Sequence, residues 1–260
     1  MTLSFNQELC EVRGCRITLK RCGSGPKLLY LHGANGAASV RPFMEELAKG
    51  FNVLVPEHPG FGGSDEPDWL DNIHDLAYFY LDFLEQLDLK DVLLVGASIG
   101  GWLALEIAVR DTSRIRALTA VGPLGIYVPG LKRGDLFLWS PEEKVRNLFF
   151  DQKIAEQMLA QPTTPEQIET EVKNQYTVAR LAWEPRMFDP HLAKWLHRVR
   201  VPTQIIWGDS DRVLPAGYAA DFKKLIPHAR VDIVARCGHT PHVEKPQEFA
   251  RLVREFAAKN

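Results

Sequence analysis

The chain has 260 residues, with 31 basic and 33 acidic side chains and a formal net charge of −2. Its 45% of hydrophobic and 25% of charged residues are typical of a globular protein that buries a sizeable core. The balanced charge excludes a basic stripe for nucleic acid and a polybasic patch for a membrane, so we expect a small-molecule partner, with a homodimer left open.

Segments that would direct the chain to a membrane are not evident in the sequence. No stretch reaches the roughly 20 apolar residues that span a bilayer, and the first eight residues lack the regions of a signal peptide. We therefore expect a cytoplasmic protein. The four cysteines show no C-x-x-C spacing, which predicts reduced thiols, and neither they nor the histidines stand at metal-ligand spacing. No metal and no cofactor are expected.

Short apolar runs alternate with turn residues in the first third of the chain. Residues 15–19 alternate with period two, residues 28–31 form a continuous apolar run, and the two are predicted to pair as antiparallel strands. The next predicted elements are a helix at 41–49, a strand at 53–55, a loop at 56–64 and an amphipathic helix at 73–87.

Strands and helices then alternate along the chain. The predicted elements are a strand at 92–95, a helix at 101–110 and a strand at 115–121, and later a strand at 203–207, a helix at 216–225, a strand at 230–234 and a helix at 247–257. This alternation predicts an α/β fold with a mostly parallel, twisted sheet and helices on both faces.

The strand signal stops between residues 122 and 199. Ser140 and Thr164 each begin a capping box with proline at the first helical position, which predicts helices in this segment. We expect an α/β core formed by residues 1–122 and 200–260, with an all-helical cap, or lid, at 123–199. Open α/β sheets bind ligands at the carboxyl edge of the sheet, so the cap is expected there.

Residues 96–100 read G-A-S-I-G and lie between a predicted strand and a predicted helix. The pattern places Ser98 in a tight turn, and the glycines on either side leave room for it. A serine hydroxyl is a poor nucleophile, so it needs a base and a group that orients the base. Asp209 and Asp211 follow the strand at 203–207, and His239 follows the strand at 230–234.

At these residues the chain resembles the α/β-hydrolase fold family, and the resemblance covers nearly its whole length. The matching segments are H-G at 32–33, P-G-F-G-G-S at 59–64, W-G-D-S-D at 207–211, and G-H at 238–239 followed by Glu244 and Pro246. The resemblance implies a serine hydrolase in which Ser98 is the nucleophile, His239 the general base and then acid, and Asp211 the orienting carboxylate. Asp209 is the competing acid.

Other groups were weighed for the same roles. The resemblance implies an oxyanion hole made by the main-chain N–H groups of Ala34 and Ile99. The alternative bases are interpreted as loop or surface residues: His32, His58, His228 and His242. Cys237, two residues before His239, is interpreted as a buried structural thiol rather than a nucleophile.

The cap is rich in aromatic residues, which predicts an apolar pocket above Ser98. The candidate pocket residues are Asn35, Trp139, Phe149, Trp183, Val213 and Thr240. The expected substrate is a small ester with an apolar or aromatic part, cleaved through an acyl-enzyme. Acyl transfer and perhydrolysis use the same residues, and a ligand-binding protein on a hydrolase fold is a further alternative.

Within the family, the hydrolases that cleave carbon–carbon bonds in ring-fission products of aromatic degradation are similar in length and cap placement, including a segment like residues 148–152. Two features depart from their pattern. Thr240 stands where those enzymes usually carry tryptophan, and their cap arginine for the substrate carboxylate has only Lys173, Arg180 or Arg186 as counterparts. Carbon–carbon cleavage is therefore the second expectation, after ester hydrolysis.

Overall fold

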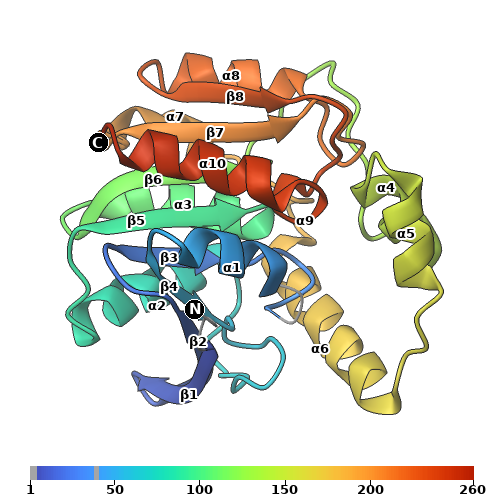
Figure 1. Ribbon diagram of the computed structural model, residues 1–260, viewed down its shortest axis with the longest axis horizontal. Helices are drawn as coiled ribbons and strands as arrows, with labels where there is room; N and C mark the ends of the chain where they lie inside the picture. Colours follow the sequence, from blue (N-terminus) through green and yellow to red (C-terminus); the bar gives the residue numbers. More distant parts are fainter. Residues whose placement is uncertain (1–4, 38–40) are drawn as a thin grey trace.

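The computed structural model describes residues 5–37 and 41–260 and holds one eight-stranded sheet (Figure 1). The strand order is β1-β2-β4-β3-β5-β6-β7-β8. The strands are β1 Phe5–Val12, β2 Cys15–Cys22, β3 Lys27–Leu31, β4 Asn52–Pro56, β5 Val92–Ala97, β6 Ile115–Val121, β7 Thr203–Gly208 and β8 Arg230–Val234. From β4 through β8 neighbouring strands are parallel, which confirms the predicted mostly parallel sheet.

The antiparallel part of the sheet differs from the predicted pairing. β2 pairs antiparallel with β1 and with β4, whereas β3 pairs parallel with β4 and β5. The predicted pair of residues 15–19 with 28–31 is therefore wrong, because β4 lies between them. Arg13 and Gly14 both have positive φ, at 52° and 78°, and form the tight turn between β1 and β2. β3 is almost fully buried, as suits an inner parallel strand.

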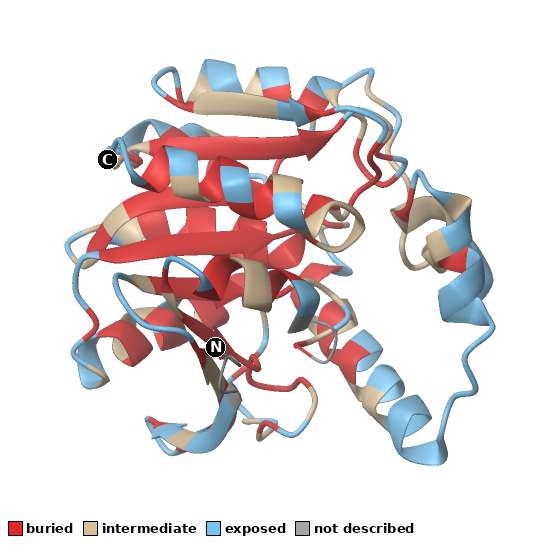
Figure 2. Ribbon diagram, in the orientation of Figure 1, coloured by how far each residue is buried: buried red, intermediate tan, exposed pale blue. Residues whose placement is uncertain are grey.

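Helices cover both faces of the sheet, as predicted (Figure 2). One face carries α1 (Arg41–Ala48) and α10 (Pro246–Ala257), and the other carries α2 (Ile73–Gln86), α3 (Ile99–Arg110) and α8 (Gly217–Leu225). Each face has its own apolar core, with Phe43 and Phe249 in one and Phe83, Leu103 and Phe222 in the other. Two packed layers thus hold the strand ends in place.

The segment between β6 and β7 is mainly helical. Its elements are α4 Pro141–Leu148, α5 Gln152–Leu159, α6 Pro165–Ala182, α7 Leu192–Trp195 and the 3-10 helix η1 Leu196–Arg198. Both predicted capping boxes are confirmed, at Ser140 and Thr164. Figure 1 shows α4, α5 and α6 beyond the carboxyl ends of the strands. The division into a core and a cap at 123–199 stays a prediction.

Two features complete the fold. A short helix, α9 (Pro241–Glu244), connects the loop after β8 to α10. Within the described part of the chain, every helix is too short or too polar to cross a membrane.

Candidate active site

Ser98 lies in a tight turn between β5 and α3. Its φ of 56° and ψ of −116° lie outside the regions that L residues favour, and such conformations are typical of functional sites. A Cβ atom on Gly96 would overlap the carbonyl oxygen of Gly100, and one on Gly100 would overlap that of Leu31. The two glycines are therefore required by close backbone contacts, as the motif predicts.

Ser98, His239 and Asp211 form a continuous line of hydrogen bonds. The Nε2 atom of His239 lies 2.9 Å from Oγ of Ser98, and its Nδ1 atom lies 2.7 Å from Oδ2 of Asp211. The other carboxylate oxygen of Asp211 accepts from the N–H groups of Val213 and Leu214, at 2.8 and 2.9 Å. An ionised Asp211 holds the proton on Nδ1, which leaves Nε2 free to accept the serine proton.

Asp209, the competing acid, has different partners. Its Oδ1 atom accepts from the hydroxyl of Ser210 at 2.7 Å and from the N–H of Cys237 at 3.3 Å. The bond from Ser210 and those from main-chain N–H groups lower the pKa of Asp209. This carboxylate joins the loop after β7, which carries Asp209 and Asp211, to the loop after β8, which carries His239 and is called the histidine loop below. The geometry therefore favours Asp211 as the partner of His239.

The predicted oxyanion donors lie on both sides of Ser98. Ile99 is the first residue of α3, so its N–H is one of the helix N-terminal donors without an acceptor inside the helix. Ala34 follows Gly33, where an added Cβ atom would lie 3.4 Å from Cβ of Ser98. This contact brings the 32–37 loop against the serine. The oxyanion role of Ala34 and Ile99 stays a prediction.

Two of the alternative bases, His32 and His58, make hydrogen bonds that hold the 32–37 loop in place. His32 donates from Nδ1 to the carbonyl of Gly33 at 2.8 Å and accepts at Nε2 from the N–H of His58 at 2.9 Å. His58 donates from Nε2 to the carbonyl of His32 at 3.1 Å, and its Nδ1 atom accepts from the hydroxyl of Tyr80. Burial lowers the pKa of His32 and, more strongly, that of His58, which favours the neutral form of both rings.

The remaining alternatives are His242 and His228 for the base and Cys237 for the nucleophile, and their contacts indicate structural roles. Burial lowers the pKa of His242 to about 3, and its ring packs against Tyr30 and Phe43. His228 is exposed, and its Nε2 atom lies 3.1 Å from the carbonyl oxygen of Val201. Cys237 is fully buried, and burial raises the pKa of its thiol far above the usual range. A thiol in this state is a poor nucleophile.

Three predicted pocket residues lie at the catalytic loops. Val213 is fully buried and donates its N–H to Asp211. Phe149 is 3% exposed, and its Cα lies against Gly238, directly before His239. Thr240 follows that histidine, and its buried hydroxyl has no hydrogen-bond partner among the described residues.

The other three pocket candidates make their contacts elsewhere. Asn35 is exposed, and its carbonyl accepts from Nδ2 of Asn174 at 3.4 Å. Trp139 is half-buried against Gly134. Trp183 is 49% exposed and packs edge-on against Phe137. Their place in a substrate pocket stays a prediction.

The cap cations considered for a substrate carboxylate all have partners. Lys173 donates to the carbonyls of Gly62 and Ser64, at 2.8 and 2.7 Å. Arg180 donates to Glu66 at 3.0 Å, and Arg186 donates to Asp135 at 2.6 Å. Lys173 and Arg180 therefore bind α6 to the loop after β4, and Arg186 forms a pair within the segment between β6 and β7, so none of the three presents a free charge.

One cluster in the described residues has the composition of a metal site. His74, Glu106 and Asp189 bring three potential ligand atoms within 4.8 Å of one another. The guanidinium of Arg110 already occupies this cluster, 2.6 Å from Oε2 of Glu106 and 2.8 Å from Nδ1 of His74. The hydrogen bond to Glu106 raises the pKa of His74. We interpret the cluster as an ion-pair network between α2, α3 and the cap.

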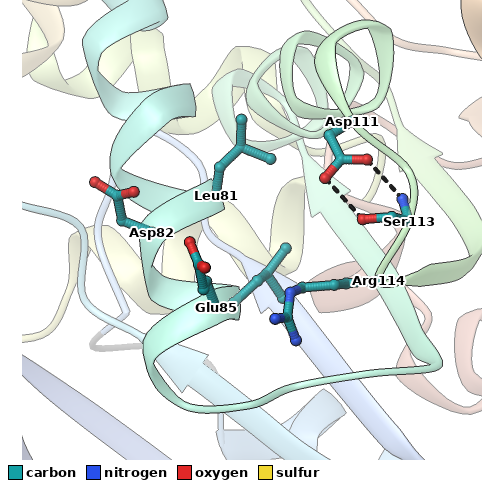
Figure 3. Close-up of a pocket in the computed structure, with 7 residues that line it drawn as sticks. Leu81, Asp82, Glu85, Asp111, Ser113 and Arg114 are labelled. Carbon is teal, nitrogen blue, oxygen red and sulfur yellow. Dashed lines mark hydrogen bonds between the residues drawn. The ribbon is translucent and has the colours of Figure 1, made fainter.

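A surface hollow lies at the opposite end of the sheet (Figure 3). It is lined by Leu81 and Glu85 near the end of α2 and by Asp111, Ser113 and Arg114 in the turn between α3 and β6. These segments precede the amino ends of β5 and β6, whereas Ser98 follows the carboxyl end of β5. The hollow is therefore separate from Ser98, Asp211 and His239.

Comparisons with known proteins show similarity along most of the chain. A family model described as alpha/beta hydrolase fold matches residues 26–246. The chain is 26% identical over 261 residues to 2-hydroxy-6-oxo-2,4-heptadienoate hydrolase of Pseudomonas putida (strain F1), covering 94% of each chain. It is 27% identical over 268 residues to 2-hydroxymuconate semialdehyde hydrolase of Pseudomonas sp. (strain CF600), covering 95% of this chain and 92% of the relative.

A solved structure shows the same fold. It is a membrane phospholipase A described as a bacterial virulence factor, with a TM-score of 0.76 and 25% identity. The match covers 98% of this chain and 86% of the phospholipase. The similarity thus includes the segment between β6 and β7 as well as the sheet.

Proposed function

Because this chain belongs to the alpha/beta hydrolase fold family, we propose that it hydrolyses a carbon–carbon bond in a small dienoic ring-fission product, with Ser98 as the nucleophile. The line of hydrogen bonds from Asp211 through His239 to Ser98, at 2.7 and 2.9 Å, carries the proposal. All three residues are at most 9% exposed, so water competes little for these bonds. This arrangement activates a serine for attack on a carbonyl.

The chemistry follows from the positions of these groups. As Oγ of Ser98 attacks a carbonyl carbon, Nε2 of His239 accepts the hydroxyl proton, and Asp211 stabilises the imidazolium. The N–H groups of Ala34 and Ile99 would hold the oxyanion, each contributing about 100- to 1,000-fold in rate. The bond to the leaving atom then breaks, His239 gives that atom its proton, and a water molecule releases the acyl group from Ser98.

The curated relatives support the carbon–carbon reaction. Two of them are named as hydrolases of 2-hydroxy-6-oxo-2,4-heptadienoate and of 2-hydroxymuconate semialdehyde, and each aligns with more than nine-tenths of this chain. In such substrates the bond beside a ketone or aldehyde carbonyl is broken. When the 2-hydroxy group is in its keto form, with the proton on the carbon beside that carbonyl, the electron pair of the broken bond is delocalised over the enone and a dienolate leaves. This support places carbon–carbon cleavage ahead of ester hydrolysis, the reverse of the order expected from the sequence alone.

Ester hydrolysis is the second candidate, and specific residues favour it. Thr240 replaces the tryptophan that is usual in carbon–carbon hydrolases of the family. The cap cations Lys173, Arg180 and Arg186 are bound by carbonyl or carboxylate oxygens, so none of them is free for a substrate carboxylate. A small uncharged ester with an apolar or aromatic part would not need such a cation.

A direct comparison of substrates separates the two reactions. We expect the purified protein to turn over 2-hydroxy-6-oxo-2,4-heptadienoate with a kcat/KM about 100-fold above that for p-nitrophenyl butyrate. Ser98→Ala is the control for both reactions. The opposite ratio would establish ester hydrolysis instead, and a protein inactive on both substrates would contradict the proposal.

A further inference from the structure

The carboxylate of Glu244 joins the histidine loop to the cap. Its Oε2 atom accepts from the N–H of Gly238 at 2.7 Å and from the N–H of Phe150 at 3.2 Å. Its Oε1 atom accepts from the N–H of Asp151 at 2.7 Å. Gly238 directly precedes His239, whereas Phe150 and Asp151 lie in the cap between α4 and α5. One charged group thus binds main-chain donors of both segments, and charge-assisted bonds of this kind are strong.

A second set of contacts joins the same two segments. The N–H of His239 donates to the carbonyl of Leu148 at 2.8 Å. A Cβ atom on Gly238 would overlap that carbonyl oxygen and would lie 2.9 Å from Cα of Phe149. The backbone of residues 148–150 therefore lies directly on the backbone that carries the catalytic histidine, and only glycine fits between them.

The other side of the cap is fastened to different loops. On α6, Lys173 donates to Gly62 and Ser64, and the hydroxyl of Thr177 donates to the carbonyl of Gly60 at 2.6 Å. These bonds connect α6 to the loop after β4, far along the chain from the histidine loop. Of the two attachments, that of residues 148–151 is the one that contacts the backbone of His239.

We propose that Glu244 is a positioning residue that makes the placement of His239 depend on the docking of residues 148–151. The inference deepens the proposed function and rests on it. If this segment lifts, the N–H of His239 loses the carbonyl of Leu148, and Glu244 loses the two donors of residues 150–151 that help to hold it against the N–H of Gly238. The imidazole then moves away from Ser98, and a displacement of about 1 Å costs on the order of 100-fold in rate. The base is fully assembled only when this part of the cap is seated.

The test combines two variants with a matched control. Glu244→Gln keeps only one carbonyl oxygen, so it retains either the bond to Asp151 or the bonds to Phe150 and Gly238. Glu244→Ala loses all three, and the glutamine variant keeps the test valid if the alanine variant does not fold. The control is Glu248→Gln, because Glu248 is a half-buried glutamate on α10 whose carboxylate lies 3.9 Å from Nζ of Lys245.

Amide hydrogen exchange shows whether residues 148–151 stay docked, and kinetics shows whether His239 is correctly placed. We expect exchange to accelerate together in peptides covering residues 148–151 and 238–240 of both Glu244 variants, and to stay unchanged in Glu248→Gln. On the better substrate, we expect kcat to fall about 10- to 100-fold with a smaller change in KM and a shifted acid limb of the pH profile of kcat/KM.

Two results would overturn the inference. One is faster exchange at 148–151 with kcat and the pH profile unchanged, which would make Glu244 merely structural. The other is acceleration in only one of the two peptides. The exchange measurement needs no substrate, so a wild-type protein without hydrolase activity would refute the proposed function, while the exchange result would still decide whether the two segments are linked.

Discussion

The Nε2 atom of His239 lies 2.9 Å from Oγ of Ser98, although the two residues are 141 positions apart in the chain. Their meeting follows from the sheet. Ser98 follows the carboxyl end of β5, and the loop with His239 follows the carboxyl end of β8. Parallel strands bring these ends to one edge. The segment between β6 and β7 leaves the sheet at the same edge, so it contacts both residues.

Replacement of the nucleophile is the simplest test of the site. Ser98→Ala should reduce kcat by roughly 10,000-fold or more on any substrate that the wild-type protein hydrolyses, because no other described side chain occupies its position. The fold should be retained, since the change removes one oxygen atom. Steady-state kinetics and circular dichroism check the two parts, and residual activity near that of the wild type would contradict the role of Ser98.

The two aspartates should differ in their effects. Asp211→Asn replaces the acceptor of the His239 Nδ1 proton, and we expect a loss in kcat of about 100- to 10,000-fold. Asp209→Asn changes a group that binds Ser210 and the N–H of Cys237, and we expect a loss below about 10-fold. Parallel kcat measurements on both variants decide the matter, and a larger effect of the Asp209 variant would reverse the assignment.

The hydroxyl of Tyr80 supports the loop of the expected oxyanion hole. Tyr80→Phe leaves Nδ1 of His58 buried without its donor, which should lower the free energy of unfolding by about 1–3 kcal/mol. Because His58 binds His32, we expect kcat to fall as well. Tyr218→Phe, another fully buried tyrosine on α8, is the matched control. Urea unfolding and kinetics check the result, and equal kcat values for both variants would separate Tyr80 from catalysis.

His242 should make the protein sensitive to acid. The unfolded chain protonates this residue near pH 6.5, whereas the folded protein does so only near its lowered pKa of about 3. Below pH 6.5 the unfolded state therefore binds more protons, and stability is lost as the pH falls. At pH 5 this residue alone should cost about 2 kcal/mol relative to pH 7.5.

A variant isolates this effect from other titrating groups. His242→Phe places an uncharged ring beside Tyr30 and Phe43, and its loss of stability between pH 7.5 and pH 5 should be smaller by that amount. Urea unfolding at the two pH values provides the measurement. An unchanged pH dependence would show that His242 is not responsible.

Motifs whose residues are required by the local backbone geometry were predictable from the sequence. The G-x-S-x-G turn and the capping boxes at Ser140 and Thr164 depend on neighbouring residues, and the structure has all three. Pairing across longer distances was not predictable in the same way. β1 was missed because most of its described side chains are exposed and polar, and β4 separates two strands that are close in sequence.

The same limit applies to the candidate site. Asp211 and His239 follow strands and carry motifs, so their proximity to Ser98 could be inferred. Tyr80 gave no signal beyond its place on the apolar face of α2. The contact of Glu244 with residues 150–151 joins positions more than 90 residues apart, and no local pattern encodes it.

Covalent labelling of Ser98 tests the central claim most directly. A fluorophosphonate reacts with a serine only when a neighbouring base activates it, and it needs no knowledge of the natural substrate. Peptide mass spectrometry should show one adduct per wild-type chain, on the peptide that contains Ser98, and none in Ser98→Ala. His239→Ala should label at least about 100-fold more slowly. No adduct on wild-type protein, or an adduct at another residue, would contradict the account.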